Sequence, residues 1–200
     1  MTDEALPPRP RGSYAKGVAR RQEILDRAIE VFAERGSDKT SLRAIAQEVG
    51  VTHAALTHHF GSLEALLVEV YREFERRGDR DDPHSSDATP VGIMQESARR
   101  NRTVAGLVQL YSMLVAAALE EGHPAARDFA TRRFAALRHE LAELVRGHQR
   151  DGVLREDVDP DAVAALVIAA SDGLQTQWLL DPDAPQDEAL ALLEKLLAHP

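Results

Sequence analysis

The chain has no cysteine and no long apolar run, and each shortage excludes a class of protein. Without cysteine there is no disulfide scaffold, no thiolate zinc site and no cysteine nucleophile. The longest unbroken apolar stretch, Ala162–Ala170, has nine residues, about half of what a bilayer span requires. The first ten residues include Asp3, Glu4 and three prolines, so we expect no signal peptide. These shortages predict a cytoplasmic protein that does not contact a membrane.

Negative charge dominates the 200 residues, but it is unevenly distributed. The formal net charge is −9, yet residues 1–80 carry 13 basic and 13 acidic side chains, against 11 and 20 in residues 81–200. Five basic residues occur between positions 9 and 21 without an acid: Arg9, Arg11, Lys16, Arg20 and Arg21. They form either a solvated basic tail or an arm that contacts a polyanion. A nucleic acid would therefore bind at the N-terminal end.

Apolar residues recur with helical spacing along the whole chain, and no stretch alternates with a two-residue period. The pattern predicts an all-α protein of about nine helices, the first running from about Val18 to Arg35. A polar, acidic segment bounded by prolines marks a linker over residues 79–90. We expect a basic flexible arm over 1–17, a helical domain over 18–61, a connecting helix over 62–78 and a second domain over 91–200.

The segment Thr40–Phe60 has the spacing that a helix-turn-helix requires. Ala46 supplies a small residue where the second helix crosses the first, and Gly50 can take the positive φ of the turn. Thr52 stands at the N-cap position of the second helix. A tight helical hairpin inside an ordinary bundle would explain the same spacing, but the second helix carries short or polar residues on the faces that Leu56 and Phe60 leave free. The segment therefore favours a helix-turn-helix.

In a helix-turn-helix the second helix lies in the major groove and its N-terminal residues contact base edges. His53, Ala54 and Thr57 are then base readers or thymine-methyl contacts, with His58 beside them. Arg43 reaches a guanine or a phosphate. The predicted backbone contacts come from helix N-termini and from the basic arm. The full predicted DNA-binding set is Arg9, Arg11, Lys16, Arg20, Arg21, Thr40, Ser41, Arg43, Thr52, His53, Ala54, Thr57 and His58.

Particular residue types surround this helix pair in a recognisable order. They are Phe32-Ala33-Glu34-Arg35-Gly36, Thr40-Ser41-Leu42-Arg43-Ala44-Ile45-Ala46, Gly50-Val51-Thr52, His58-His59-Phe60-Gly61-Ser62 and Glu64-Ala65-Leu66. Over Gln22–Tyr71 the chain resembles the TetR family of bacterial transcription regulators. The resemblance implies an all-α homodimer with an N-terminal DNA-binding domain and a C-terminal ligand-binding and dimerisation domain. It also implies a repressor that binds a palindromic operator and is released by a small-molecule effector of unknown identity.

The chain departs from the family pattern at three positions of the predicted DNA surface. Thr57 stands where an aromatic residue is frequent, Leu63 where a lysine is frequent, and His53 where the residue is often basic or an amide. The aromatic and the lysine usually touch phosphate, so these changes weaken the expected grip on the DNA backbone. Affinity is then expected to depend more on the basic arm.

Other patterns point to no metal, no cofactor and no enzyme. His53, His58 and His59 lack a cysteine or a carboxylate at ligand spacing, which favours a surface role over metal binding. Ser112, Ser171 and Asp172 are present, but no turn motif presents any of them as a nucleophile.

Side chains with polar or polarisable atoms occur within the apolar helices of the second domain. Each one either packs in the core or contacts an effector: Met94, Arg99, Tyr111, Met113, Phe134, Gln175 and Trp178. The arginines 99, 100 and 102 form either a solvated face or a lid over an anionic effector. A helical adaptor that binds protein, and a regulator with a filled core that binds no effector, remain alternatives.

A glycine within the last long apolar helix, Gly173, costs about 1 kcal/mol relative to alanine. Close approach of a partner helix would explain it. Together with the leucine-rich C-terminal stripe it predicts the dimer interface, formed by Leu166, Ile168, Gly173, Leu174, Leu190, Leu193 and Leu197.

Overall fold

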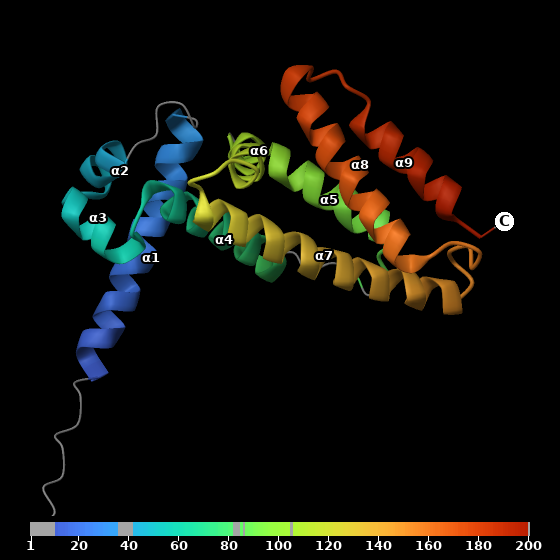
Figure 1. The fold of residues 1–200 in the computed structure, drawn as a ribbon, viewed down its shortest axis with the longest axis horizontal. Coiled ribbons are helices and arrows are strands. Elements are labelled where there is room, and N and C mark those ends of the chain that lie inside the picture. Colours follow the sequence, from blue (N-terminus) through green and yellow to red (C-terminus); the bar gives the residue numbers. More distant parts are fainter. Residues whose placement is uncertain (1–10, 36–41, 82–84, 86, 105, 200) are drawn as a thin grey trace, which may run out of the picture.

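The computed structural model describes residues 11–35, 42–81, 85, 87–104 and 106–199. Within these ranges the chain forms nine α-helices and no strand, which confirms the all-α prediction (Figure 1). The helices are α1 (Arg11–Arg35), α2 (Leu42–Val49), α3 (His53–Phe60), α4 (Leu63–Asp81), α5 (Pro90–Arg102), α6 (Leu107–Ala118), α7 (Pro124–Arg150), α8 (Pro160–Leu180) and α9 (Gln186–Leu197).

The first helix starts earlier than its apolar pattern indicates. α1 begins at Arg11 and not near Val18, so residues 11–17 of the expected arm are helical. This stretch has no apolar face, and periodicity therefore could not reveal it. In Figure 1 the first turns of α1 extend away from the rest of the molecule.

Several helices start where the sequence supplies a capping oxygen or a proline. The side chains of Thr52, Thr89 and Asp159 each accept a hydrogen bond from a backbone N–H three residues ahead. Such caps satisfy amides that have no partner within the helix. Pro90, Pro124 and Pro160 occupy first helical positions, where a missing N–H costs nothing.

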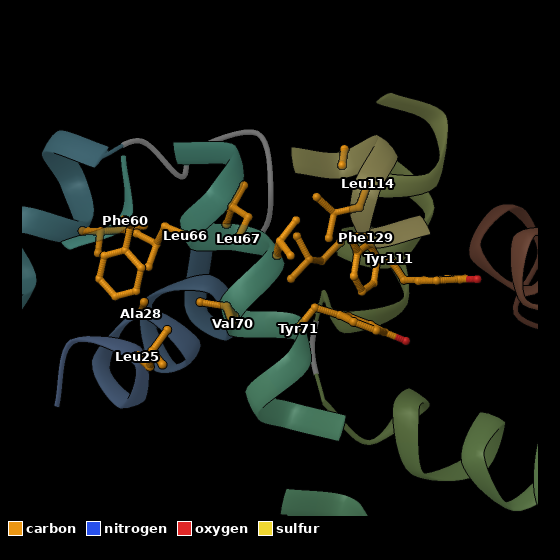
Figure 2. Packing of buried hydrophobic residues seen from close by; sticks show 14 of the residues in the cluster. Leu25, Ala28, Phe60, Leu66, Leu67, Val70, Tyr71, Tyr111, Leu114 and Phe129 are labelled. Atoms are coloured by element: carbon orange, nitrogen blue, oxygen red, sulfur yellow. The ribbon is translucent and has the colours of Figure 1, made fainter. Parts of the chain in front are cut away.

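The described residues form two apolar cores, and α7 contributes to both of them (Figure 1). In the first core, α4 lies between α1–α3 on one side and α6 with the start of α7 on the other, as Figure 2 shows for Leu66, Val70 and Tyr71. The second core combines α5, the second half of α7, α8 and α9. The packing thus divides the chain differently from the expected linker at 79–90, because α6 belongs with the N-terminal helices.

α8 is the one helix among the described residues with the length and composition to cross a membrane. The core helix of a soluble protein passes the same test. In this fold Val163, Val167 and Ile168 of α8 are buried in the second core, and its exposed side includes alanines, Gly173 and Leu166.

Candidate nucleic-acid interface and effector cavity

The turn between α2 and α3 has the geometry that the sequence predicts. Gly50 adopts φ +69°, a conformation that glycine takes without a steric penalty. The N–H of Val51 donates to the carbonyl of Ala46 over 2.9 Å, which closes the end of α2. Ala46 is buried at the crossing. The Oγ1 of Thr52 accepts a hydrogen bond from the N–H of Ala55 at 3.1 Å, so Thr52 is the N-cap of α3.

α3 has one buried face and one open face. Leu56 is 0% exposed and Phe60 9%, and both pack into the first core. His53, Ala54, Thr57 and His58 are exposed. The Thr57 hydroxyl donates to the His53 carbonyl over 3.0 Å, which leaves its methyl group and its remaining lone pairs for an outside partner. The side chains of this open face are therefore accessible to an outside partner.

The other predicted DNA contacts fall into three groups. Arg43 is exposed on α2. Arg20 pairs with Glu23 at 2.5 Å, and Arg21 pairs with Glu69 of α4 at 2.6 Å while it lies over the Phe60 ring. Arg21 thus ties α1 to α4. Arg9, Thr40 and Ser41 lie outside the described residues, as do the side chains of Arg11 and Lys16. Leu63, where the family often has lysine, packs against the first core.

A polar network holds the N-terminal helices on α4. The carboxylate of Glu73 is 5% exposed and accepts from Gln22 of α1 at 2.8 Å and from Arg77 at 2.8 Å. Arg77 also pairs with Asp26 of α1. The Gln22–Glu73 and Asp26–Arg77 contacts each join α1 to α4, and the Glu73–Arg77 pair within α4 links them. A displacement of α4 is therefore expected to move α1 as well.

The first turn of α4 is hydrogen-bonded to the start of α7. Glu64 Oε2 lies 2.5 Å from Nδ1 of His123, and Glu64 Oε1 accepts from the N–H of Ala126 at 2.8 Å. Burial opposes the charge of Glu64, but the Ala126 amide and His123 outweigh it, so the pKa of Glu64 lies below its usual value. We call this contact the Glu64 clasp. Sequence reasoning missed it because its residues are 59 or more positions apart.

A cavity of about 350 Å³ lies among α4, α5, α6, α7 and α8, within the range of small-molecule sites. Tyr71 of α4 and Tyr111 of α6 stack in its wall, with ring centroids 5.3 Å apart. Figure 2 shows these two tyrosines at the end of the first core. Arg133 of α7 lies over both rings and pairs with Glu75 of α4. The cavity thus borders α4, the helix to which α1 is bonded by the polar network described above.

Hydrogen bonds and buried charges shape the polar part of the cavity. The hydroxyl of Tyr111 donates to Asp172 Oδ2 over 2.9 Å. Burial raises the pKa of Tyr71, Tyr111 and Asp172 above their usual values. Burial disfavours the charge of Arg133, but the neighbouring tyrosines and Glu75 outweigh it and raise its pKa. Arg133 therefore remains a cation.

The predicted effector contacts divide between the cavity and other places. Met94, Tyr111 and Gln175 line it. Arg99 pairs with Glu96 and Asp187, Met113 is 38% exposed, and neither lines the cavity. Phe134 packs between the two cores, and Trp178 is half-buried away from the cavity. Sequence reasoning did not assign Tyr71 or Arg133 to a pocket, since the cavity forms from five helices and no local pattern marks it.

The predicted dimer residues also divide. Ile168, Leu190 and Leu197 are at most 6% exposed because they fill the second core of the same subunit, and Leu174 and Leu193 pack against that core. Only Leu166 and Gly173 are exposed. The leucine stripe of α9 in fact has two sides, and the outward side carries Leu192 and Leu196, 57% and 60% exposed.

A helix-turn-helix with an open second helix, joined through α4 to a helical domain with a cavity, defines a class of DNA-binding regulator. The family described as "Bacterial regulatory proteins, tetR family" matches residues 24–70. The family described as "BetI-type transcriptional repressor, C-terminal" matches residues 96–199.

Individual relatives agree with these matches. The transcriptional repressor KstR2 of Rhodococcus jostii is 39% identical over 69 residues, 34% of either chain. The chain thus matches about a third of the length of the first of its relatives. The transcriptional regulator BetI of Brucella canis is 26% identical over 190 residues, 90% of either chain. A regulator from Saccharomonospora viridis, crystallised with choline, has the same fold, with a TM-score of 0.66 and 22% identity over 92% of this chain and all of its own.

The chain belongs to the TetR family of bacterial transcriptional regulators. The members of this family are DNA-binding regulators and not enzymes. They bind DNA and small-molecule effectors, and dimers are typical of them.

Proposed function

We propose that the protein is a cytoplasmic homodimeric repressor that binds a palindromic operator and is released by a small-molecule effector. The observation that carries the proposal is the open face of α3, where His53, Ala54 and Thr57 are exposed while Leu56 and Phe60 anchor the helix. Such a face on the second helix of a helix-turn-helix fits the major groove. A helical adaptor that binds protein would not require this turn geometry, and it would not belong to a family of DNA-binding regulators.

The exposed face of α8 supports the dimer. Ala162, Leu166, Ala169 and Gly173 are exposed along one side of the helix, and a Cβ added to Gly173 would meet no atom within 4 Å. Small side chains allow helices to approach closely, and α9, which packs against α8, carries further exposed leucines. We assign the dimer contacts to this surface and to Leu192 and Leu196 in place of the buried leucines.

The cavity favours a regulator that binds an effector over a regulator whose core is filled. Its walls include Tyr71 and Glu75 of α4. A ligand in the cavity would therefore contact α4 directly, and α4 is bonded to α1 of the DNA-binding domain. The regulator from Saccharomonospora viridis was crystallised with choline, so this fold can hold a small molecule. An effector that prefers a different spacing of the two α3 helices would release DNA.

Salt dependence of DNA binding tests the proposal. We expect the affinity for a mixed duplex pool to fall by about a thousandfold or more between about 50 and 200 mM salt. Replacing Arg11 and Lys16 by glutamine should reduce the dependence of the affinity on salt. Replacing Arg132, an exposed residue of α7, by glutamine should not change it. Binding that does not weaken with salt would contradict contact with phosphates.

A further inference from the structure

The effector cavity already contains a cation of its own. The guanidinium of Arg133 lies 5.4 Å from the Tyr71 ring centroid and 5.1 Å from that of Tyr111, and it pairs with Glu75. Aromatic faces in this arrangement are the usual recognition site for a ligand cation. A cationic effector would have to displace a tethered, ion-paired arginine, so the aromatic pair does not favour one.

Hydrogen-bond donors in the cavity have capacity for an acceptor. The Nε atom of Arg133 is buried and has no hydrogen-bond partner among the described residues. The amides of Asn101 and Gln175 donate only over 3.5 Å, to Gln175 and to Ser171. Buried donors that lack a good partner are costly. An acceptor group on a ligand would relieve this cost.

The acids of the cavity do not cancel this preference. Glu75 is already paired with Arg133, and Glu140 lies at the exposed edge. Asp172 already accepts the Tyr111 hydroxyl, and burial raises its pKa. Arg100 adds a second guanidinium from α5, which lies close to Gly78 of α4.

The geometry points to a small organic acid as the effector, with its carboxylate held by Arg133 and Arg100 and its apolar body against Met94, Leu141 and Leu144. Guanidinium groups bind carboxylates with two parallel hydrogen bonds, and Met94 of α5 with Leu141 and Leu144 of α7 supply apolar surface in the same cavity. This inference rests on the proposed function of the cavity. A ligand carboxylate competes with Glu75 for Arg133 and thereby loosens the contact between α7 and α4.

The test compares probes that share an apolar body and differ in charge: octanoate, octan-1-ol and octyltrimethylammonium, with 4-phenylbutanoate as a second acid. Calorimetric titration of the full-length protein should show binding of an acid at least about tenfold tighter than the alcohol, and weaker or no binding of the ammonium. Tighter binding of the ammonium than of the acids overturns the inference. So does the failure of both acids to bind more tightly than about 1 mM.

Two substitutions locate the carboxylate. Arg133→Gln should weaken acid binding by about ten- to a hundredfold, and Arg100→Gln gives the same readout if the first variant fails to fold. Arg132→Gln is the matched control, because Arg132 is 76% exposed and pairs with Asp128 on the same helix. Unchanged acid binding in folded Arg133→Gln and Arg100→Gln contradicts the assignment.

The same preparations separate this inference from the proposed function. DNA binding with the expected salt slope, without acid binding, overturns the effector class alone. Acid binding by a protein that binds no duplex contradicts the regulator and leaves the carboxylate site in place.

Discussion

Gly50 is the residue on which the orientation of α3 depends. Its φ of +69° costs a residue with a Cβ about 1–2 kcal/mol. We therefore expect Gly50→Ala to lower the free energy of unfolding by that amount and to weaken DNA binding, measured by denaturant titration and by duplex titration.

Gly17→Ala is the matched control for this substitution. Gly17 lies within α1, is exposed, and has open space where a Cβ would stand. Alanine is the better helix former by about 0.5–1 kcal/mol, so this variant should be slightly more stable than the parent. Equal effects at both glycines would show that the turn does not require the left-handed conformation.

Thr57 and His53 are predicted to read bases. Each alanine substitution should cost about 1–3 kcal/mol on a preferred duplex and relax the preference at one position, while binding to unrelated duplexes is unchanged. Competition titrations with single-base variants measure this. Thr131→Ala, exposed on α7, should change neither quantity. A uniform loss on all duplexes would mean that these side chains contact phosphate and not bases.

At the scale of elements, the Glu64 clasp joins α4, which follows the helix-turn-helix, to α7, which borders the cavity. Its carboxylate holds a backbone N–H at the start of α7 and the ring of His123. Negative charge is favourable at the N-terminus of a helix. The clasp therefore gives a contact through which α7 can affect α4.

The pH dependence of stability tests the clasp. The pKa of Glu64 is lower in the folded protein than its usual value of 4.5, so the clasp stabilises the fold above that pH and is lost as pH falls through the folded value. Glu64→Gln should lower the free energy of unfolding by about 1 kcal/mol at neutral pH, and the difference should vanish in acid. Glu121→Gln, exposed in the nearby loop, should show no such trend. A difference that persists in acid would contradict the clasp.

Elements whose signal is local could be predicted from the sequence. The cap at Thr52, the turn at Gly50 and the buried Leu56 follow from residue types at fixed short spacings. The number of helices follows from the spacing of apolar residues along the chain. The cavity could not be predicted, because Tyr71, Tyr111 and Arg133 come from three helices that only the folded chain brings together. Leu190 and Leu197 were predicted to contact a partner but are buried in the core of their own subunit, since helical periodicity does not tell which side of α9 faces its own subunit.

At the scale of the whole molecule, two copies must place their α3 helices about one duplex turn, 34 Å, apart. The exposed face of α8 and α9 is the surface through which we expect the copies to pair. Leu192→Glu puts a charge in this surface and should give a folded monomer by light scattering. Its affinity for an inverted repeat should fall by about a hundredfold or more, because each half-site is then bound separately.

Leu119→Glu is the control for this charge. Leu119 is 83% exposed at the end of α6, outside the α8 and α9 surface, so the variant should remain a dimer with unchanged DNA binding. A Leu192→Glu protein that is still dimeric would place the interface elsewhere.

Selection of bound duplexes from a random DNA pool tests most directly whether the open face of α3 reads DNA in a symmetric dimer. We expect the full-length protein to enrich an inverted repeat whose half-site centres are about 10 base pairs apart or a multiple of that. The protein with both His53→Ala and Thr57→Ala should lose this preference. Enrichment of no sequence, or of the same repeat by that variant, would contradict base reading by α3.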